Sequence, residues 1–165
     1  MTKCRIKSMA ASLLTAFMLL QTAPKVMADN TAIGYGQGTA VDSENCPSDA
    51  LAFNDRYREY NAYATTPDKK RIIITFDQGY ENGYTADILD TLKEKNVKAI
   101  FFLTGDYAKK ENALVKRMID EGHVLGNHGM THASLPKLNE EDAKQEVMSL
   151  HDYVLDEYGY EMQYF

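Results

Sequence analysis

A basic stripe is absent from this sequence of 165 residues. Its 18 lysines and arginines are outnumbered by 24 aspartates and glutamates, which gives a formal net charge of −6 at pH 7. Binding to the backbone of a nucleic acid needs clustered lysine and arginine side chains. The composition therefore argues against a protein that binds nucleic acid, whereas a hydrophobic fraction of 44% is ordinary for a folded globular domain.

The sequence also lacks a hydrophobic run long enough to cross a membrane. Its N-terminal apolar run, Met9–Leu20, has 12 residues, whereas a spanning helix needs about 20. Basic residues precede this run within positions 3–7, and small residues follow it at Val26–Ala28. This layout predicts a secretory signal peptide over residues 1–28, with export to the bacterial envelope and no stable membrane span after cleavage. An uncleaved signal anchor is the alternative.

Cysteine is scarce, since only Cys4 and Cys46 occur. Cys4 lies within the predicted signal peptide, so the mature chain would keep Cys46 alone and form no internal disulfide. An exported chain without disulfides fits a bacterial cell surface. No motif around Cys46 indicates a nucleophile.

Residues 29–66 show little periodic pattern and are predicted to form an N-terminal extension. The tyrosine-rich residues 51–63 suggest a short helix within it. Gly34–Gly38 is not a phosphate loop, because no Lys-Ser/Thr pair follows it. A turn signal at Thr65–Asp68 places the start of the main domain at residue 67, and that domain is predicted over 67–165.

From residue 70 onward, short apolar runs alternate with helical periodicity. The runs that predict strands are Ile72–Phe76, Ala99–Leu103, His123–Gly126 and Met162–Phe165. The first of them is β-branched and continuous, which predicts a strand buried on both faces.

Apolar residues recur at helical spacing between these runs, over residues 84–92, 114–119 and 143–154. Asn139 is a predicted N-cap of the last helix, with Asp142 at its N3 position, and Gly159 is its predicted end. Alternating strands and helices predict an α/β fold with a parallel sheet. About 100 patterned residues are too few for a closed eightfold barrel, so the domain is either a small open sheet or part of a larger barrel.

Active sites of parallel α/β folds gather at the carboxyl ends of the strands. Asp77 follows the first predicted strand, and His128 and His132 follow the third. The two histidines are four residues apart, and if that stretch were helical both rings would face one side, a spacing common for two ligands of one divalent metal. They could equally be ordinary surface residues. Gly129 occupies the place where a zinc peptidase has glutamate, which argues against that class.

Two roles are open for Asp77, either bracing the turn after its strand or taking a proton from the attacking water. Five other polar residues are expected to have plainer roles. Glu81 belongs to the turn or caps the next helix, His123 and His151 are structural or packing residues, and Asp106, with Thr104, could line the rim.

At these positions the sequence resembles a known family. Thr75–Gly79 (Thr-Phe-Asp-Gln-Gly) is similar to the first signature of polysaccharide deacetylases, Thr-Phe-Asp-Asp-Gly, in the NodB-homology domain of carbohydrate esterase family four. Glu121–His128 followed by His132 resembles the second signature, His-Ser/Thr-x-x-His. The longer string Thr75–Thr85 resembles the branch of delta-lactam-biosynthetic de-N-acetylases of spore cortex peptidoglycan.

The resemblance implies a distorted (β/α) barrel, of which this chain would hold the first three to four βα units. It implies metal-assisted hydrolysis of N-acetyl groups from peptidoglycan, with N-acetylmuramic acid as the substrate of a sporulation enzyme and glycan strands as the partner. Carried over by position, Asp77 would be the catalytic base. His128 and His132, with Gln78 as a third candidate, would bind a divalent metal such as Zn²⁺, Co²⁺ or Mg²⁺.

Three departures from the family pattern stand out. Gln78 replaces a carboxylate ligand with a more weakly binding amide, and Gly129 replaces a serine or threonine whose hydroxyl could brace the loop. The family's Arg-Pro-Pro-x-Gly signature would begin after Phe165, where the sequence ends, so we expect a fragment with little activity of its own. The alternative function is an inactive deacetylase-like module that binds cell-wall glycan.

Overall fold

A computed structural model describes residues 40–65 and 70–165 of the chain. The predicted signal peptide, the glycine-rich residues 34–38 and most of the predicted turn at Thr65–Asp68 lie outside the described residues. Within the N-terminal extension, helix α1 (Ser48–Tyr57) and the 3-10 turn η1 (Arg58–Tyr60) form where a short helix is expected. No helix of the described part of the chain is long and apolar enough to span a membrane.

Three parallel strands form the centre of the domain, in the order β1 (Thr75–Gln78), β2 (Ile100–Leu103) and β3 (Val124–Asn127). Their register is even, because Thr75 pairs with Ile100 and Ile100 pairs with Val124. The connecting helices are α2 (Thr85–Glu94), α3 (Gly105–Lys110) and α4 (Asn112–Asp120). The turn η2 (Leu135–Lys137) and the long helix α5 (Glu140–Tyr158) follow β3. The predicted α/β fold with a parallel sheet is therefore confirmed.

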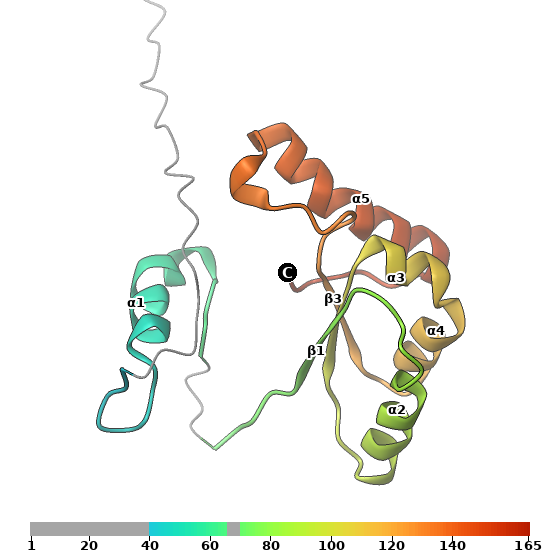
Figure 1. The fold of residues 1–165 in the computed structure, drawn as a ribbon, viewed down its shortest axis with the longest axis horizontal. Coiled ribbons are helices and arrows are strands. Elements are labelled where there is room, and N and C mark those ends of the chain that lie inside the picture. The colour runs from blue at the N-terminus through green and yellow to red at the C-terminus, as the bar shows by residue number, and fades with distance from the viewer. Residues whose placement is uncertain (1–39, 66–69) are drawn as a thin grey trace, which may run out of the picture.

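Helices α2, α3 and α4 lie on one side of the sheet, and α5 crosses near the upper ends of the strands (Figure 1). The core forms between the sheet and these helices. Alternate strand residues point into it, among them the fully buried Phe101, Leu103 and Leu125. Leu150 and Val154 bring α5 into the same cluster. Alternation along a strand sends the intervening side chains to the opposite face of the sheet.

The prediction of a strand through Ile72–Ile74 buried on both faces is wrong. Strand β1 begins at Thr75, and Ile72 is 90% exposed. The pairing explains the difference: the N–H of Ile100 donates to the carbonyl of Ile74 at 2.9 Å, and Ile100 is the first residue of β2. Residues before Ile74 therefore run past the end of the neighbouring strand. β1 is also an edge strand among the described residues.

The structure differs from the prediction at two other places. The sequence did not predict the separate helix α3, whose N-terminus is capped by the Thr104 side chain, which accepts a hydrogen bond from the N–H of Tyr107 at 3.3 Å. Residues 162–165 do not form the expected fourth strand. They lie beside β3 through one backbone hydrogen bond, from the N–H of Asn127 to the carbonyl of Tyr164 at 2.8 Å.

The predicted ends of the last helix are confirmed. The Asn139 side chain accepts a hydrogen bond from the N–H of Asp142 at 2.9 Å, and Asp142 accepts one from the Asn139 amide at 2.7 Å. Gly159 ends the helix with a φ of 65°, in the left-handed region that glycine adopts without a Cβ clash.

His123 is a structural residue, as expected from the sequence. Its ring is buried edge-on against Phe101, and its Nδ1 accepts a hydrogen bond from the N–H of Ala99 at 3.2 Å. Burial lowers the pKa of His123, and the charge of Lys98 lowers it further, while Glu121 opposes them. Although Nε2 of His123 lies 4.0 Å from a Glu121 oxygen, the lowered pKa means that the ring is neutral at pH 7 and forms no ion pair.

We expect His123 to make folding stability fall in mild acid. The unfolded chain protonates this histidine near its ordinary pKa of about 6.5, whereas the folded chain resists protonation, so stability is lost as the pH falls below that value. Urea unfolding between pH 7.5 and 5 should show a shallower pH dependence in His123→Gln than in the parent. Equal slopes in the two proteins would contradict this role.

Candidate functional site

The three strands end level with one another, at Gln78, Leu103 and Asn127. The pairing continues one residue beyond the strands, because the N–H of Thr104 donates to Gln78 at 3.0 Å and that of His128 donates to Leu103 at 2.9 Å. The segments that follow the strands therefore leave from the same edge of the sheet. The predicted convergence of the site at the carboxyl ends has this register as its physical basis.

Asp77 lies on the face of the sheet opposite the core. Its neighbour Phe76 stacks on the buried Phe101, with ring centroids 4.9 Å apart, and alternation turns Asp77 the other way. Asp77 is exposed and pairs in register with Phe102, which in turn pairs with Gly126. Two strand spacings separate Asp77 from Gly126 by roughly 10 Å between Cα atoms.

Gln78, the third candidate ligand, occupies the last position of β1 and is 8% exposed. Its Cβ therefore points away from the face that carries Asp77.

The two other residues expected to line the rim have structural contacts. Thr104 caps α3, and Asp106 forms an exposed ion pair with Lys110 at 2.9 Å.

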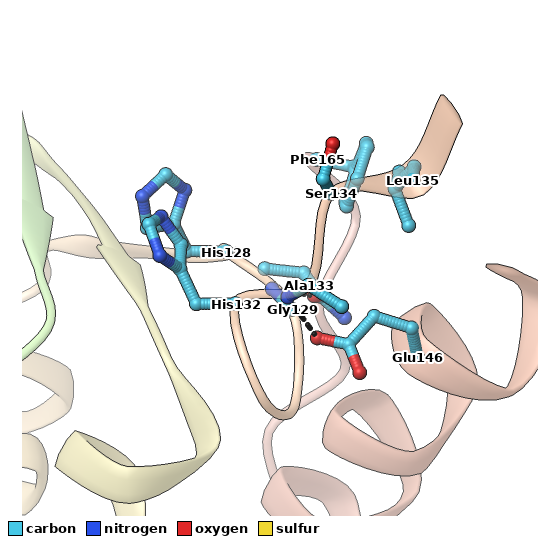
Figure 2. A pocket seen from close by; sticks show the side chains of 9 residues that line it. His128, Gly129, His132, Ala133, Ser134, Leu135, Glu146 and Phe165 are labelled. Carbon is cyan, nitrogen blue, oxygen red and sulfur yellow. Dashed lines mark hydrogen bonds between the residues drawn. The ribbon is translucent and has the colours of Figure 1, made fainter. Parts of the chain in front are cut away.

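The structure brings His128 and His132 together, but through a loop and not a helical turn. Residues 128–134 have no regular secondary structure. Two of them adopt left-handed backbone angles, Gly129 with a φ of 87° and His132 with a φ of 60°. These angles fold the loop back so that the two ring centroids are 4.7 Å apart, with their planes inclined by 44°. Figure 2 shows the two imidazoles side by side on one side of the loop.

The carboxylate of Glu146, on α5, holds this loop from its other side (Figure 2). One oxygen accepts hydrogen bonds from the N–H of Thr131 at 2.7 Å and of Ala133 at 3.2 Å. The other accepts from the Thr131 hydroxyl at 2.9 Å. Burial favours a higher pKa for Glu146, but these hydrogen bonds outweigh burial and hold its pKa below the usual range.

Asn127 supports the start of the same loop. Its side-chain oxygen accepts a hydrogen bond from the N–H of Gly129 at 2.9 Å, and its amide donates to the carbonyl of Val147 at 2.8 Å. A hollow of about 390 Å³ lies beside the loop, and its walls include the two histidines, Leu135 and Phe165. This volume falls within the range of small-molecule sites.

The donor set is suited to a divalent cation only in part. Two imidazoles this close can ligate one ion, and imidazole binds Zn²⁺ and Co²⁺ well. Among residues 40–65 and 70–165, however, no group of three or more His, Cys, Asp or Glu side chains could hold a metal ion. Any further donors would be amide, water or substrate oxygens.

The turn between β1 and α2 is held by Glu81, as the sequence suggested. Its carboxylate accepts hydrogen bonds from the N–H of Gly83 at 2.6 Å and of Thr85 at 3.3 Å, and from the hydroxyl of Tyr107 at 3.0 Å. Burial raises the pKa of Tyr107, which keeps this donor protonated. Burial acts to raise the pKa of Glu81 as well, but the hydrogen bonds outweigh burial and lower it.

Sequence reasoning missed Glu146, although a signal was present. Glu146, Leu150 and Val154 are spaced four residues apart, and all three are buried on one face of α5. A carboxylate on an otherwise apolar helix face is buried only when it has partners. That pattern could have identified Glu146 as a residue with a specific contact.

Comparison with known proteins identifies the family to which the sequence motifs point. The model of the polysaccharide deacetylase family matches residues 64–165. The chain is 39% identical to the peptidoglycan-N-acetylmuramic acid deacetylase PdaA of Bacillus subtilis, covering 76% of this chain and 48% of the relative. It is also 39% identical to a peptidoglycan-N-acetylglucosamine deacetylase of Bacillus cereus, covering 60% of this chain and 36% of that protein.

The fold also matches a solved structure. The structure of Bacillus subtilis PdaA, described as a family 4 carbohydrate esterase, superposes with a TM-score of 0.71 and 35% identity, covering 80% of this chain and 56% of that one. The chain spans about half the length, or less, of these curated relatives.

We expect Glu81→Ala to destabilise the protein by about 1–2 kcal/mol, because it removes the acceptor of three hydrogen bonds around the first turn of α2. Urea unfolding at pH 7 measures the change. Asp106→Ala is the matched control, since it removes an exposed carboxylate whose ion pair contributes little. Equal losses in the two variants would show that the contacts of Glu81 are not what stabilises the turn.

Proposed function

Because the chain belongs to the polysaccharide deacetylase family, we propose that it carries the first half of a catalytic domain that removes N-acetyl groups from peptidoglycan. The observation that supports this most directly is the pair of imidazoles 4.7 Å apart at the carboxyl edge of the sheet, two strands from the exposed Asp77. The reaction adds water to the acetamide, breaks the carbon–nitrogen bond, and yields acetate and a free amine.

N-acetylmuramic acid is the proposed substrate sugar. Similarity to the Bacillus subtilis muramic acid deacetylase extends over 127 residues, more than the segment 64–165 contains. Similarity to the glucosamine deacetylase of Bacillus cereus covers only 99 residues. Resemblance before residue 64 therefore favours the muramic acid branch, in which delta-lactam formation during sporulation is the proposed role.

Each proposed site residue has one task. His128 and His132 hold a divalent cation, with the amide oxygen of Gln78 as the proposed third protein donor. Such a cation, when bound, polarises a carbonyl oxygen and acidifies water. Asp77 takes the proton from the water that attacks the acetyl carbon, and its exposure on the open face leaves room for a sugar beside it.

The proposed place of action is the bacterial cell envelope, where peptidoglycan lies. Export would use the signal peptide predicted over residues 1–28, followed by the extension 29–66 and the deacetylase domain 67–165. The curated relatives named above are peptidoglycan deacetylases, in agreement with this location.

A decisive assay measures acetate release from muramic acid glycan strands stripped of peptide, and from N-acetylglucosamine oligomers as the competing substrate. The chain is assayed alone and joined after Phe165 to the remaining half of the Bacillus subtilis relative, with Zn²⁺, Co²⁺ or Mg²⁺ and then with EDTA. We expect metal-dependent acetate from the muramic acid glycan. Acetate release from the glucosamine oligomer alone would contradict N-acetylmuramic acid as the substrate. Binding of glycan without acetate release would favour an inactive binding module.

We expect His128→Ala and His132→Ala each to abolish measurable Co²⁺ binding, because each removes one imidazole of the pair. Titration calorimetry of the chain measures the affinity. His151→Ala is the control, since its ring lies on α5 and contacts the carbonyl of Met162 at 3.2 Å. Unchanged affinity in both site variants would rule out this cation site.

Asp77→Asn is expected to slow acetate release by about 10²- to 10⁴-fold while leaving Co²⁺ affinity unchanged, because it removes a base and no proposed metal ligand. Steady-state kinetics of the joined protein measures the loss. Asp87→Asn, an exposed carboxylate on α2, is the matched control. Parent-like kinetics in Asp77→Asn would remove Asp77 from the mechanism.

A further inference from the structure

We propose that Glu146 is the positioning residue of the site, a buried carboxylate on α5 that fixes the loop 128–133 so that the imidazoles of His128 and His132 face one cation. This inference rests on the proposed function for the identity of the cation site. The geometry of the loop, however, can be tested without any metal.

The contacts of Glu146 show how it would act. Its side chain is 7% exposed, and both oxygens are occupied by donors of the loop, two from Thr131 and one from Ala133. Its backbone carbonyl accepts a fourth hydrogen bond, from the N–H of Met130 at 2.9 Å. One residue of α5 thus binds both the middle and the end of the loop.

The position of these contacts indicates that Glu146 orients the loop and does not itself ligate the cation. The carboxylate approaches the loop from one side, and the histidine rings project from the other (Figure 2). Glu146 therefore reaches the rings only through the backbone between them. Its pinning of Thr131 and Ala133 restrains His132, which lies between these two residues and has a φ of 60°. A non-glycine residue keeps such an angle only when its surroundings impose it.

Gly129 is the loop residue that leaves room for the Glu146 carboxylate. A Cβ at this position would lie 2.7 Å from an oxygen of Glu146, and the φ of 87° would disfavour any L side chain. The sequence lacks the serine or threonine hydroxyl that the family signature has at position 129, and Glu146 occupies the space beside it. In this chain the loop is therefore braced beside position 129 by the carboxylate from α5.

The first experiment uses the metal-free protein and nuclear magnetic resonance. We expect the amides of Thr131 and Ala133 to be protected from solvent exchange, and the ring protons of His128 and His132 to show cross-relaxation. Both signals should be lost in Glu146→Ala. They should be retained in Glu146→Gln, because its amide oxygen can accept from the two N–H groups and its NH₂ can donate to the Thr131 hydroxyl.

The second experiment measures Co²⁺ affinity by calorimetry and by the visible absorption of the bound ion. Glu146→Ala is expected to weaken binding about 10- to 100-fold, as is usual when a residue that orients a ligand is removed. Gly129→Ala should weaken binding too, while Glu146→Gln should remain within about threefold of the parent. Glu157→Ala, an exposed carboxylate on the last turn of α5, is the matched control and should have no effect.

The outcomes separate the two proposals. If the parent binds no Co²⁺ but its loop signals depend on Glu146, the cation site fails and the positioning of the loop stands. If the amide protection and ring contact persist in Glu146→Ala, the positioning role is overturned whether or not metal binds. Should Glu146→Ala fail to fold, Gly129→Ala decides the question, because parent-like ring contact and affinity in that variant overturn the proposal.

Discussion

The even register of the three parallel strands is the constraint on which the rest of this domain depends. Because Gln78, Leu103 and Asn127 end level, polar residues about 50 positions apart in the chain emerge at one edge of the sheet. Backbone hydrogen bonds carry the register one step further, to Thr104 and His128. The sheet thereby fixes where each loop begins, and local contacts then decide the shape of that loop.

Helix α5 links the stability of the domain to the geometry of the site. Leu150 and Val154 pack in the core beneath it, while Glu146, one turn earlier on the same face, binds the histidine loop. A shift of this helix that repacks the core would also move the carboxylate. The hydrophobic contacts that stabilise the fold therefore also set the position of the loop.

Sequence patterns predicted the features that depend on local chemistry. The strand–helix alternation, the Asn139 cap and the Gly159 end all follow from neighbours in the chain. The errors concern pairing between distant segments. Ile72–Ile74 has the composition of a buried strand, but its burial depends on whether strand β2 extends alongside it.

The histidine loop illustrates the same limit. The spacing of His128 and His132 suggested a shared metal, yet their proximity arises from left-handed residues and from a carboxylate 14 positions beyond His132. Neither is visible in the motif itself. The catalytic and ligand roles of Asp77, Gln78 and the two histidines stay predictions.

The two edges of the sheet differ in how they are supported, and the candidate site residues near each edge differ in the same way. The edge at β3 is met by the segment after α5, through Asn127 and Tyr164, and the histidine loop is held there on several sides. The edge at β1 has no neighbouring strand in the described part of the chain, and Asp77 lies on it. The loop that carries the imidazoles is thus held by hydrogen bonds from β3 and α5, whereas in the described part of the chain Asp77 lies on a strand that pairs on one side only. A strand that paired with this edge would also support the backbone that carries Asp77, the proposed base.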